Sequence, residues 1–117
     1  MTNITLDAAR TIVAAARAKG QEMGLKPLTV AVLDTAGNLK ALEREDGSSN
    51  MRPDIAIGKA MNELAGGSLV PVAGGVLIKD DQGAIIGACG ITGDISDNDE
   101  TAAIAGIEAA GFVADGG

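Results

Sequence analysis

Three charged residues in the first half of the chain could together bind a small acid. Arg44 lies near the end of a predicted strand, Asp46 directly follows that strand, and Lys59 lies in a predicted helix. An arginine guanidinium can hold a carboxylate in bidentate fashion, and a lysine adds a point charge. We therefore expect Arg44, Asp46 and Lys59 to form a ligand-binding site at a sheet edge that faces the helix. The alternative is a solvated cluster of ion pairs, which would contribute little to stability.

Backbone N–H groups form a second candidate site, at the point where a strand leads into a helix. Gly90, Thr92 and Gly93 lie beside the predicted helix start, which is where an anion docks. The four acidic residues that follow would repel a free phosphate: Asp94, Asp97, Asp99 and Glu100. Helix capping is the default interpretation of these acids. The functional alternative is that Glu100 or Asp99 acts as a catalytic base or hydrogen-bond acceptor.

Metal and thiol chemistry are disfavoured. Asp94, Asp97 and Asp99 could hold a hard cation such as Mg²⁺ or Ca²⁺, but no glycine and glutamate follow at the spacing that a calcium loop needs, so we expect no metal. Cys89 could be a nucleophile or a soft haem ligand, yet its apolar strand favours a buried, inert thiol. The thioethers of three methionines could also bind haem, although core filling is the expected role of Met23, Met51 and Met61.

Composition excludes several classes of function. Histidine, tyrosine and tryptophan are absent, so the chain offers no histidine ligand, no histidine general base and no serine–histidine–aspartate triad. With Phe112 as the one aromatic residue, it also lacks the stacking platforms that single-stranded nucleic acid needs. Sixteen acidic residues against nine scattered basic ones give a net charge of −7, whereas binding to a phosphate backbone needs a basic stripe. We expect no nucleic-acid partner.

The expected location is the cytoplasm. A single cysteine, Cys89, allows no disulfide framework within the chain, as is usual in a reducing compartment. No signal-peptide pattern opens the sequence, and no apolar run is long enough to span a membrane. We therefore predict a cytoplasmic protein with no membrane partner.

The elements that would position these residues form one α+β domain over residues 1–117. Helices are predicted at residues 5–23, 53–64 and 97–110, with Thr5 as an N-cap. Apolar runs predict strands at residues 28–33, 38–45, 76–78 and 84–91. Ser96 and Asp99 resemble a capping box, and residues 114–117 are expected to fray. The alternation of helices and strand pairs favours helices packed on a mainly antiparallel sheet.

A short sequence pattern is repeated in the two predicted hairpins. Asp34 and Gly37 recur at the same spacing as Asp80 and Gly83, each pair between two apolar runs. A turn acid and a glycine that can take a positive φ are what a short hairpin loop requires. The repeated pattern therefore predicts two equivalent hairpins in one sheet, although turn chemistry alone could also produce the repeat.

The order and spacing of several short motifs resemble the GlcG/HbpS family of haem-degrading or haem-binding proteins, which is related to the PduO C-terminal domain. The matching pieces are Asp34 with Gly37, Arg44-x-Asp46, Ser48 with Ser49, Lys59-Ala60, Pro71-x-x-Gly74-Gly75-Val76, Gly83-x-x-x-Gly87-Ala88, Gly90-x-Thr92-Gly93 and Asp97-x-Asp99-Glu100. The resemblance implies a profilin-like fold, with a five-stranded antiparallel sheet between helices, and a homo-oligomer that is a dimer or a larger ring.

Two departures from the family pattern bear on function. Relatives usually carry a longer, lid-like segment where only residues 61–70 join Ala60 to Pro71 here. The missing histidine also removes the obvious axial ligand of a haem, so haem would bind without one, and no other cofactor is expected.

Three functions stay open. The first is a module that binds haem or a related tetrapyrrole against Arg44 and Lys59. The second is a cofactor-independent enzyme for a small hydroxy- or keto-acid, in which Glu100 or Asp99 moves a proton. The third is a structural accessory subunit of a catabolic complex.

Overall fold

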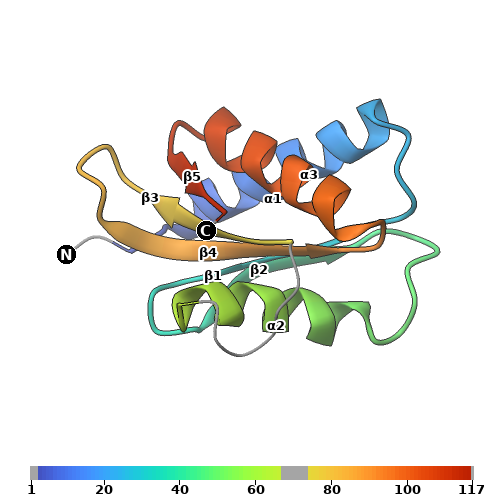
Figure 1. Ribbon diagram of the computed structural model, residues 1–117, viewed down its shortest axis with the longest axis horizontal. Helices are drawn as coiled ribbons and strands as arrows, with labels where there is room; N and C mark the ends of the chain where they lie inside the picture. The colour runs from blue at the N-terminus through green and yellow to red at the C-terminus, as the bar shows by residue number, and fades with distance from the viewer. Residues whose placement is uncertain (1–2, 67–73, 117) are drawn as a thin grey trace.

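The computed structural model describes residues 3–66 and 74–116. Along these residues the elements are α1 (Leu6–Glu22), β1 (Thr29–Leu33), β2 (Leu39–Arg44), α2 (Arg52–Leu64), β3 (Gly75–Lys79), β4 (Ile85–Thr92), α3 (Ser96–Ala109) and β5 (Val113–Asp115). The five strands form one antiparallel sheet in the order β2-β1-β4-β3-β5. Helices α1 and α3 cover one face and α2 covers the other (Figure 1), which confirms the predicted α+β fold.

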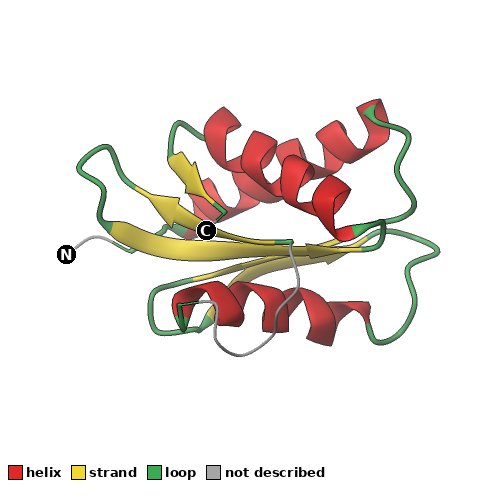
Figure 2. Cartoon of the chain, viewed as in Figure 1, coloured by secondary structure: helices red, strands yellow, loops and turns green. Residues whose placement is uncertain are grey.

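Burial on both faces of the sheet explains the continuous apolar strand β1. Val30 and Val32 belong to the large aliphatic core under α1 and α3. Leu33 packs with Ala60 of α2 and Ala88 of β4 in a smaller cluster on the other face. Since successive side chains of a strand point to opposite faces, a strand covered twice must be apolar throughout. Figure 2 shows the sheet between its helical layers.

Two glycines let α2 lie close against the sheet. Gly75 of β3 and Gly90 of β4 are register partners. A Cβ at Gly75 would collide with the carbonyl oxygen of Lys59, and one at Gly90 with the carbonyl oxygen of Ala56. The backbone of α2 therefore occupies the space that side chains would need on these strands.

The two hairpins are equivalent, as the repeated sequence pattern predicts. The Oδ1 of Asp34 accepts hydrogen bonds from the amides of Ala36 and Asn38, and the Oδ1 of Asp80 accepts from Gln82 and Ala84 in the same way. Both turns contain a glycine with positive φ, 83° at residue 37 and 82° at residue 83. Each hairpin also has a register irregularity beside its turn, between Val32 and Leu33 or between Ile78 and Lys79.

Two local predictions are wrong. The N-cap of α3 is Ile95 rather than Ser96, and no side-chain hydrogen bond caps this helix, because the Asp99 carboxylate instead accepts the amide of Asp94. Of residues 114–117, which were expected to fray, Ala114 and Asp115 instead pair with β3 as part of strand β5. An ion pair of 2.6 Å between Lys79 and Asp115 adds to that pairing.

The segment between Ala60 and Pro71 is described only in part. Helix α2 continues to Leu64, whereas residues 67–73 lie outside the described residues, and the expected lid-like departure with them. None of the helices in the described ranges is long and apolar enough to cross a membrane.

Candidate functional site

A connected set of polar side chains lies at the end of the sheet where α2 begins. Thr29 of β1 is the register partner of both Arg44 of β2 and Thr92 of β4. The Nη1 of Arg44 donates to the Ser48 carbonyl oxygen at 2.6 Å, and the Ser48 hydroxyl lies 3.1 Å from that of Thr29. The Nη1 of Arg52 donates to the Thr92 hydroxyl at 2.8 Å. We call these five residues the arginine cluster.

The two guanidinium groups of the arginine cluster have no acidic partner among the described residues. The salt bridges there are formed by other bases: Arg17, Lys19, Lys59 and Lys79. Arg44 is exposed and Arg52 half-buried. Because a guanidinium has five N–H donors, most donors of Arg44 and Arg52 stay free to bind an anion. Asp46 is exposed in the turn after β2 and is not bonded to either arginine.

An apolar surface extends from the arginine cluster along the same face of the sheet. The register places Leu39 opposite Leu33 and Leu42 opposite Ala31, which lie on the α2 side. Ile57 and Leu64 of α2 pack against the smaller cluster that contains Leu33. We call Leu39, Leu42, Ile57, Met61 and Leu64 the α2–β2 strip.

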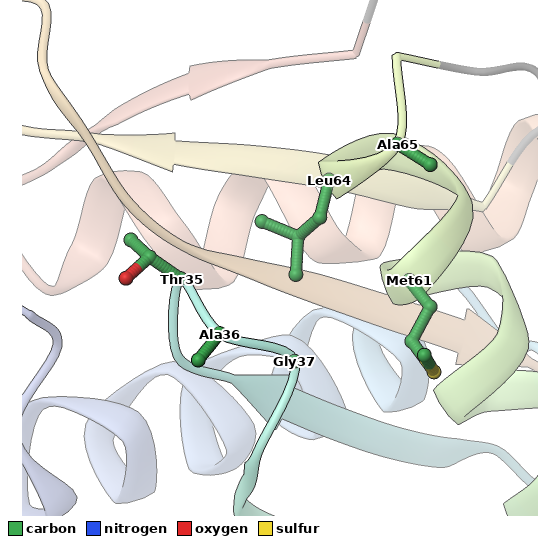
Figure 3. A pocket seen from close by; sticks show the side chains of 6 residues that line it. All are labelled: Thr35, Ala36, Gly37, Met61, Leu64 and Ala65. Atoms are coloured by element: carbon green, nitrogen blue, oxygen red, sulfur yellow. The ribbon is translucent and has the colours of Figure 1, made fainter.

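The far end of the α2–β2 strip is hollowed. A cavity of about 240 Å³ lies between the turn after β1 and the last turns of α2. Figure 3 shows Thr35, Ala36 and Gly37 on one side of it and Met61, Leu64 and Ala65 on the other. Leu39 is 51% exposed and Met61 43%. The strip is therefore an accessible apolar surface, and at one end it has two arginines that form no ion pair within residues 3–66 and 74–116.

Lys59 does not belong to this cluster. It is 7% exposed, and its Nζ donates to the Ile91 carbonyl oxygen at 2.9 Å and to the Asp99 Oδ2 at 3.4 Å. It packs against Gly74, next to β3, whereas Arg44 lies on the edge strand β2, with β1 and β4 between. The structure thus brings Arg44 together with Arg52 and separates it from Lys59.

The two candidate catalytic acids lie on α3, on the face opposite to the strip. Asp99 is fully buried, and this burial raises the pKa of its carboxyl. The hydrogen bond from the Asp94 amide and the charge of Lys59 act in the opposite direction but do not cancel the effect of burial. Glu100 is half-buried and lies against Gly116. The pKa of Glu63 is raised mainly by burial of Glu63 itself, and the charge of Glu100 raises it further. Asp99 is occupied as an ion-pair partner, and the two acids do not meet the arginine cluster.

Gly90 and Gly93 serve close packing. Gly90 makes room for α2, and Gly93 has a φ of +148° and lies against the carbonyl oxygen of Pro27. The neighbouring Asp94 accepts the Lys26 amide at 3.0 Å. That bond, with those from Asn98 and the Ile95 amide, lowers the pKa of Asp94 to about 2. Of this second candidate site, Thr92 alone joins the arginine cluster.

Cys89 is fully buried in the core under α1 and α3. Burial raises the pKa of its thiol to about 12, so the thiolate is disfavoured, as its apolar strand predicts. Its place on the face opposite to the α2–β2 strip separates it from any ligand bound there.

Sequence reasoning missed Thr29 and Arg52. Thr29 is the one polar residue in the apolar run of β1, and Arg52 immediately precedes Pro53 at the start of α2. A polar residue in a buried strand needs a hydrogen-bond partner, and that signal could have directed attention to Thr29. The position of Arg52 over Thr92 follows only from the packing of α2.

The fold and the cluster together define a small three-layer α+β protein with a cationic site beside an apolar surface. The chain belongs to the HbpS-like family, whose model, described as haem degrading protein HbpS-like, matches residues 4–65 and 60–108. The two matches overlap at residues 60–65, at the end of α2. No curated protein gives a significant match to the sequence.

Solved structures share the fold. The ORFY protein of Klebsiella pneumoniae superposes with a TM-score of 0.85 at 21% identity, covering 95% of this chain and 92% of that one. A structure described as a PduOC–haem complex gives 0.80 at 19% identity, with coverage of 95% and 97%. A double mutant of HbpS from Streptomyces reticuli gives 0.78 at 27% identity, with coverage of 92% and 87%.

Proposed function

We propose that this protein binds haem or a related tetrapyrrole on the α2–β2 strip, with the carboxylates of the ligand held by Arg44 and Arg52. The observation that carries the proposal is the juxtaposition of two unpaired guanidinium groups with an exposed apolar strip. A tetrapyrrole has the matching chemistry, an apolar macrocycle with carboxylates at one edge. Arginine binds such carboxylates in bidentate fashion.

The side chains fit the carboxylates and the macrocycle of a haem better than its iron. The chain has no histidine, and Cys89 is buried on the other face. Met61 is the residue of the strip that carries a sulfur, and it is 43% exposed. A bound haem would supply a redox-active iron, and the arginine cluster and Met61 are the groups that would orient it.

Family membership supports a haem-related ligand. The description of the family names haem degradation, and one structure of the same fold is described as a complex with haem.

The proposal includes a homo-oligomer. The open α2–β2 strip can cover one side of a flat ligand, and a second copy of the chain would cover the other side.

The arrangement favours binding over the alternative of a hydroxy- or keto-acid enzyme. Arg44 and Arg52 could also hold the carboxylate of a small acid. However, Asp99 is engaged by Lys59 and by the Asp94 amide, and α3 lies on the opposite face of the sheet. A proton donor or acceptor at the arginine cluster would have to come from elsewhere.

A hemin titration followed by Soret absorbance tests the proposal. The wild type should give a saturable shift, and the Arg44→Gln/Arg52→Gln double variant should bind about tenfold or more weakly, since it loses two charge-assisted contacts. Arg10→Gln, which removes an exposed arginine of α1, is the matched control and should bind like the wild type. A response that does not saturate, or equal binding by the double variant, would overturn the proposal.

A further inference from the structure

A second cavity lies on the other side of the edge strand β2. It measures about 260 Å³ and is an open hollow between α1 and β2. Helix α1 contributes Leu6, Arg10 and Val13, which share one face at helical spacing. Ala41 is the register partner of Val32, so it faces α1 and not α2. The α1–β2 cavity therefore opens on the α1 side of β2, and it shares one lining residue, Leu42, with the α2–β2 strip.

The charges around the α1–β2 cavity are unbalanced in favour of cations. Arg10 and Lys40 line it, and neither has an acidic partner among the described residues. The acid in its lining, Glu43, is already bonded to Arg17 at 2.6 Å. Arg17 also pairs with Glu45 at 3.1 Å, so Glu43 shares its counter-charge with a second acid. In a chain with a net charge of −7, two cations that form no ion pair among the described residues still mark a local site for an anion.

The remaining lining of the cavity is apolar. Val13 is buried in the core and Ala41 packs against it, while Leu6 is 48% exposed. Leu6 is thus a large apolar side chain that a ligand could cover. Ligand pockets for drug-sized molecules start at about 300 Å³, so this cavity suits a smaller molecule and cannot enclose a whole macrocycle.

We infer that the α1–β2 cavity binds a small monocarboxylate with an apolar body, such as a medium-chain fatty acid. The carboxylate lies between Arg10 and Lys40, and the hydrocarbon covers Leu6 and packs toward Val13 and Ala41. Charge-assisted hydrogen bonds fix the acid, and burial of the hydrocarbon adds affinity in proportion to its area. The ligand class follows because two cations without an ion pair among the described residues lie beside an apolar lining.

Calorimetric titration of the full chain with octanoate tests this inference. We expect saturable binding at one site per chain, and the Arg10→Gln/Lys40→Gln double variant should bind about tenfold or more weakly because it loses both cations. Ala41→Leu, which fills the cavity without changing charge, should also weaken binding. Arg44→Gln/Arg52→Gln is the control and should bind octanoate like the wild type.

Two further probes test the ligand class. Octanol lacks the charge and inorganic phosphate lacks the apolar body, so both should bind more weakly than octanoate. No saturable binding of octanoate, an unchanged affinity in the Arg10→Gln/Lys40→Gln variant, or phosphate that binds as tightly as octanoate would each overturn the inference. Because hemin binding is tested at other residues, either result can fail while the other holds.

Discussion

The Nζ of Lys59 lies 3.4 Å from the Oδ2 of Asp99, and this ion pair joins helices that cover opposite faces of the sheet. Lys59 belongs to α2 and Asp99 to α3, and their side chains are 7% and 0% exposed. The pair passes beside Gly74, where a Cβ would lie 2.7 Å from the lysine Nζ. The two helical layers are thus connected by a direct side-chain contact beside the start of β3.

Removing one partner of this pair should destabilise the protein. Lys59→Met leaves the Asp99 carboxylate buried without its cation, and breaking a buried pair in this way lowers the free energy of unfolding by roughly 3 to 5 kcal/mol. Urea denaturation measures the loss. Lys79→Met is the control, because its ion pair with Asp115 is partly exposed and such pairs contribute at most about 1 kcal/mol. Equal losses in the two variants would contradict a structural role for the Lys59–Asp99 pair.

Two glycine-to-alanine substitutions should have opposite effects. Gly90→Ala forces a Cβ into the carbonyl oxygen of Ala56, and overpacking of this kind costs about 1 to 3 kcal/mol. Gly58→Ala, on α2 itself, places its Cβ in open space and should stabilise the helix by about 0.5 to 1 kcal/mol. Thermal unfolding compares both with the wild type. A Gly90→Ala variant as stable as Gly58→Ala would show that α2 does not pack this closely on β4.

Asp94 should make the protein sensitive to acid. Its pKa falls from an ordinary 3.8 to about 2 in the folded chain, chiefly through the hydrogen bond from the Lys26 amide. As pH falls below 3.8, the unfolded chain takes up the proton before the folded one, so stability decreases toward pH 2. Urea midpoints at pH 2, 3, 4 and 7 should fall less steeply for Asp94→Asn. Parallel curves for the two proteins would be evidence against this assignment.

The thiol of Cys89 should be unreactive until the protein unfolds. It is fully buried and its pKa is raised to about 12 by desolvation, so the thiolate that attacks a disulfide reagent is scarce. Titration with Ellman's reagent should detect no thiol in the native protein and one thiol per chain in denaturant. Rapid reaction under native conditions would show that the strand opens.

Local turn chemistry made the hairpins predictable. Asp34 with Gly37 and Asp80 with Gly83 determine their turns through hydrogen bonds within four residues, so short sequence patterns contain the whole signal. The pairing of β1 with β4 involves residues about sixty positions apart, and no local pattern specifies it. The resemblance to the family supplied that part of the fold.

Only part of the candidate site could be read from residue types. Arg44 was identified because a guanidinium at a strand end suits a carboxylate. Lys59 was expected beside Arg44 as an added point charge, but it lies near Asp99, which is forty positions away in the sequence. Arg52 was missed, because its place over Thr92 depends on how α2 packs on the two glycines.

The most direct test of the proposed function is to locate the ligand on the protein. Backbone amide shifts of labelled protein, measured by NMR during titration with diamagnetic zinc protoporphyrin, report which residues it touches. We expect the largest changes in the arginine cluster, at Arg44, Ser48 and Arg52, and along α2 to Leu64. Changes confined to α1 and α3, or none at all, would contradict the proposed function.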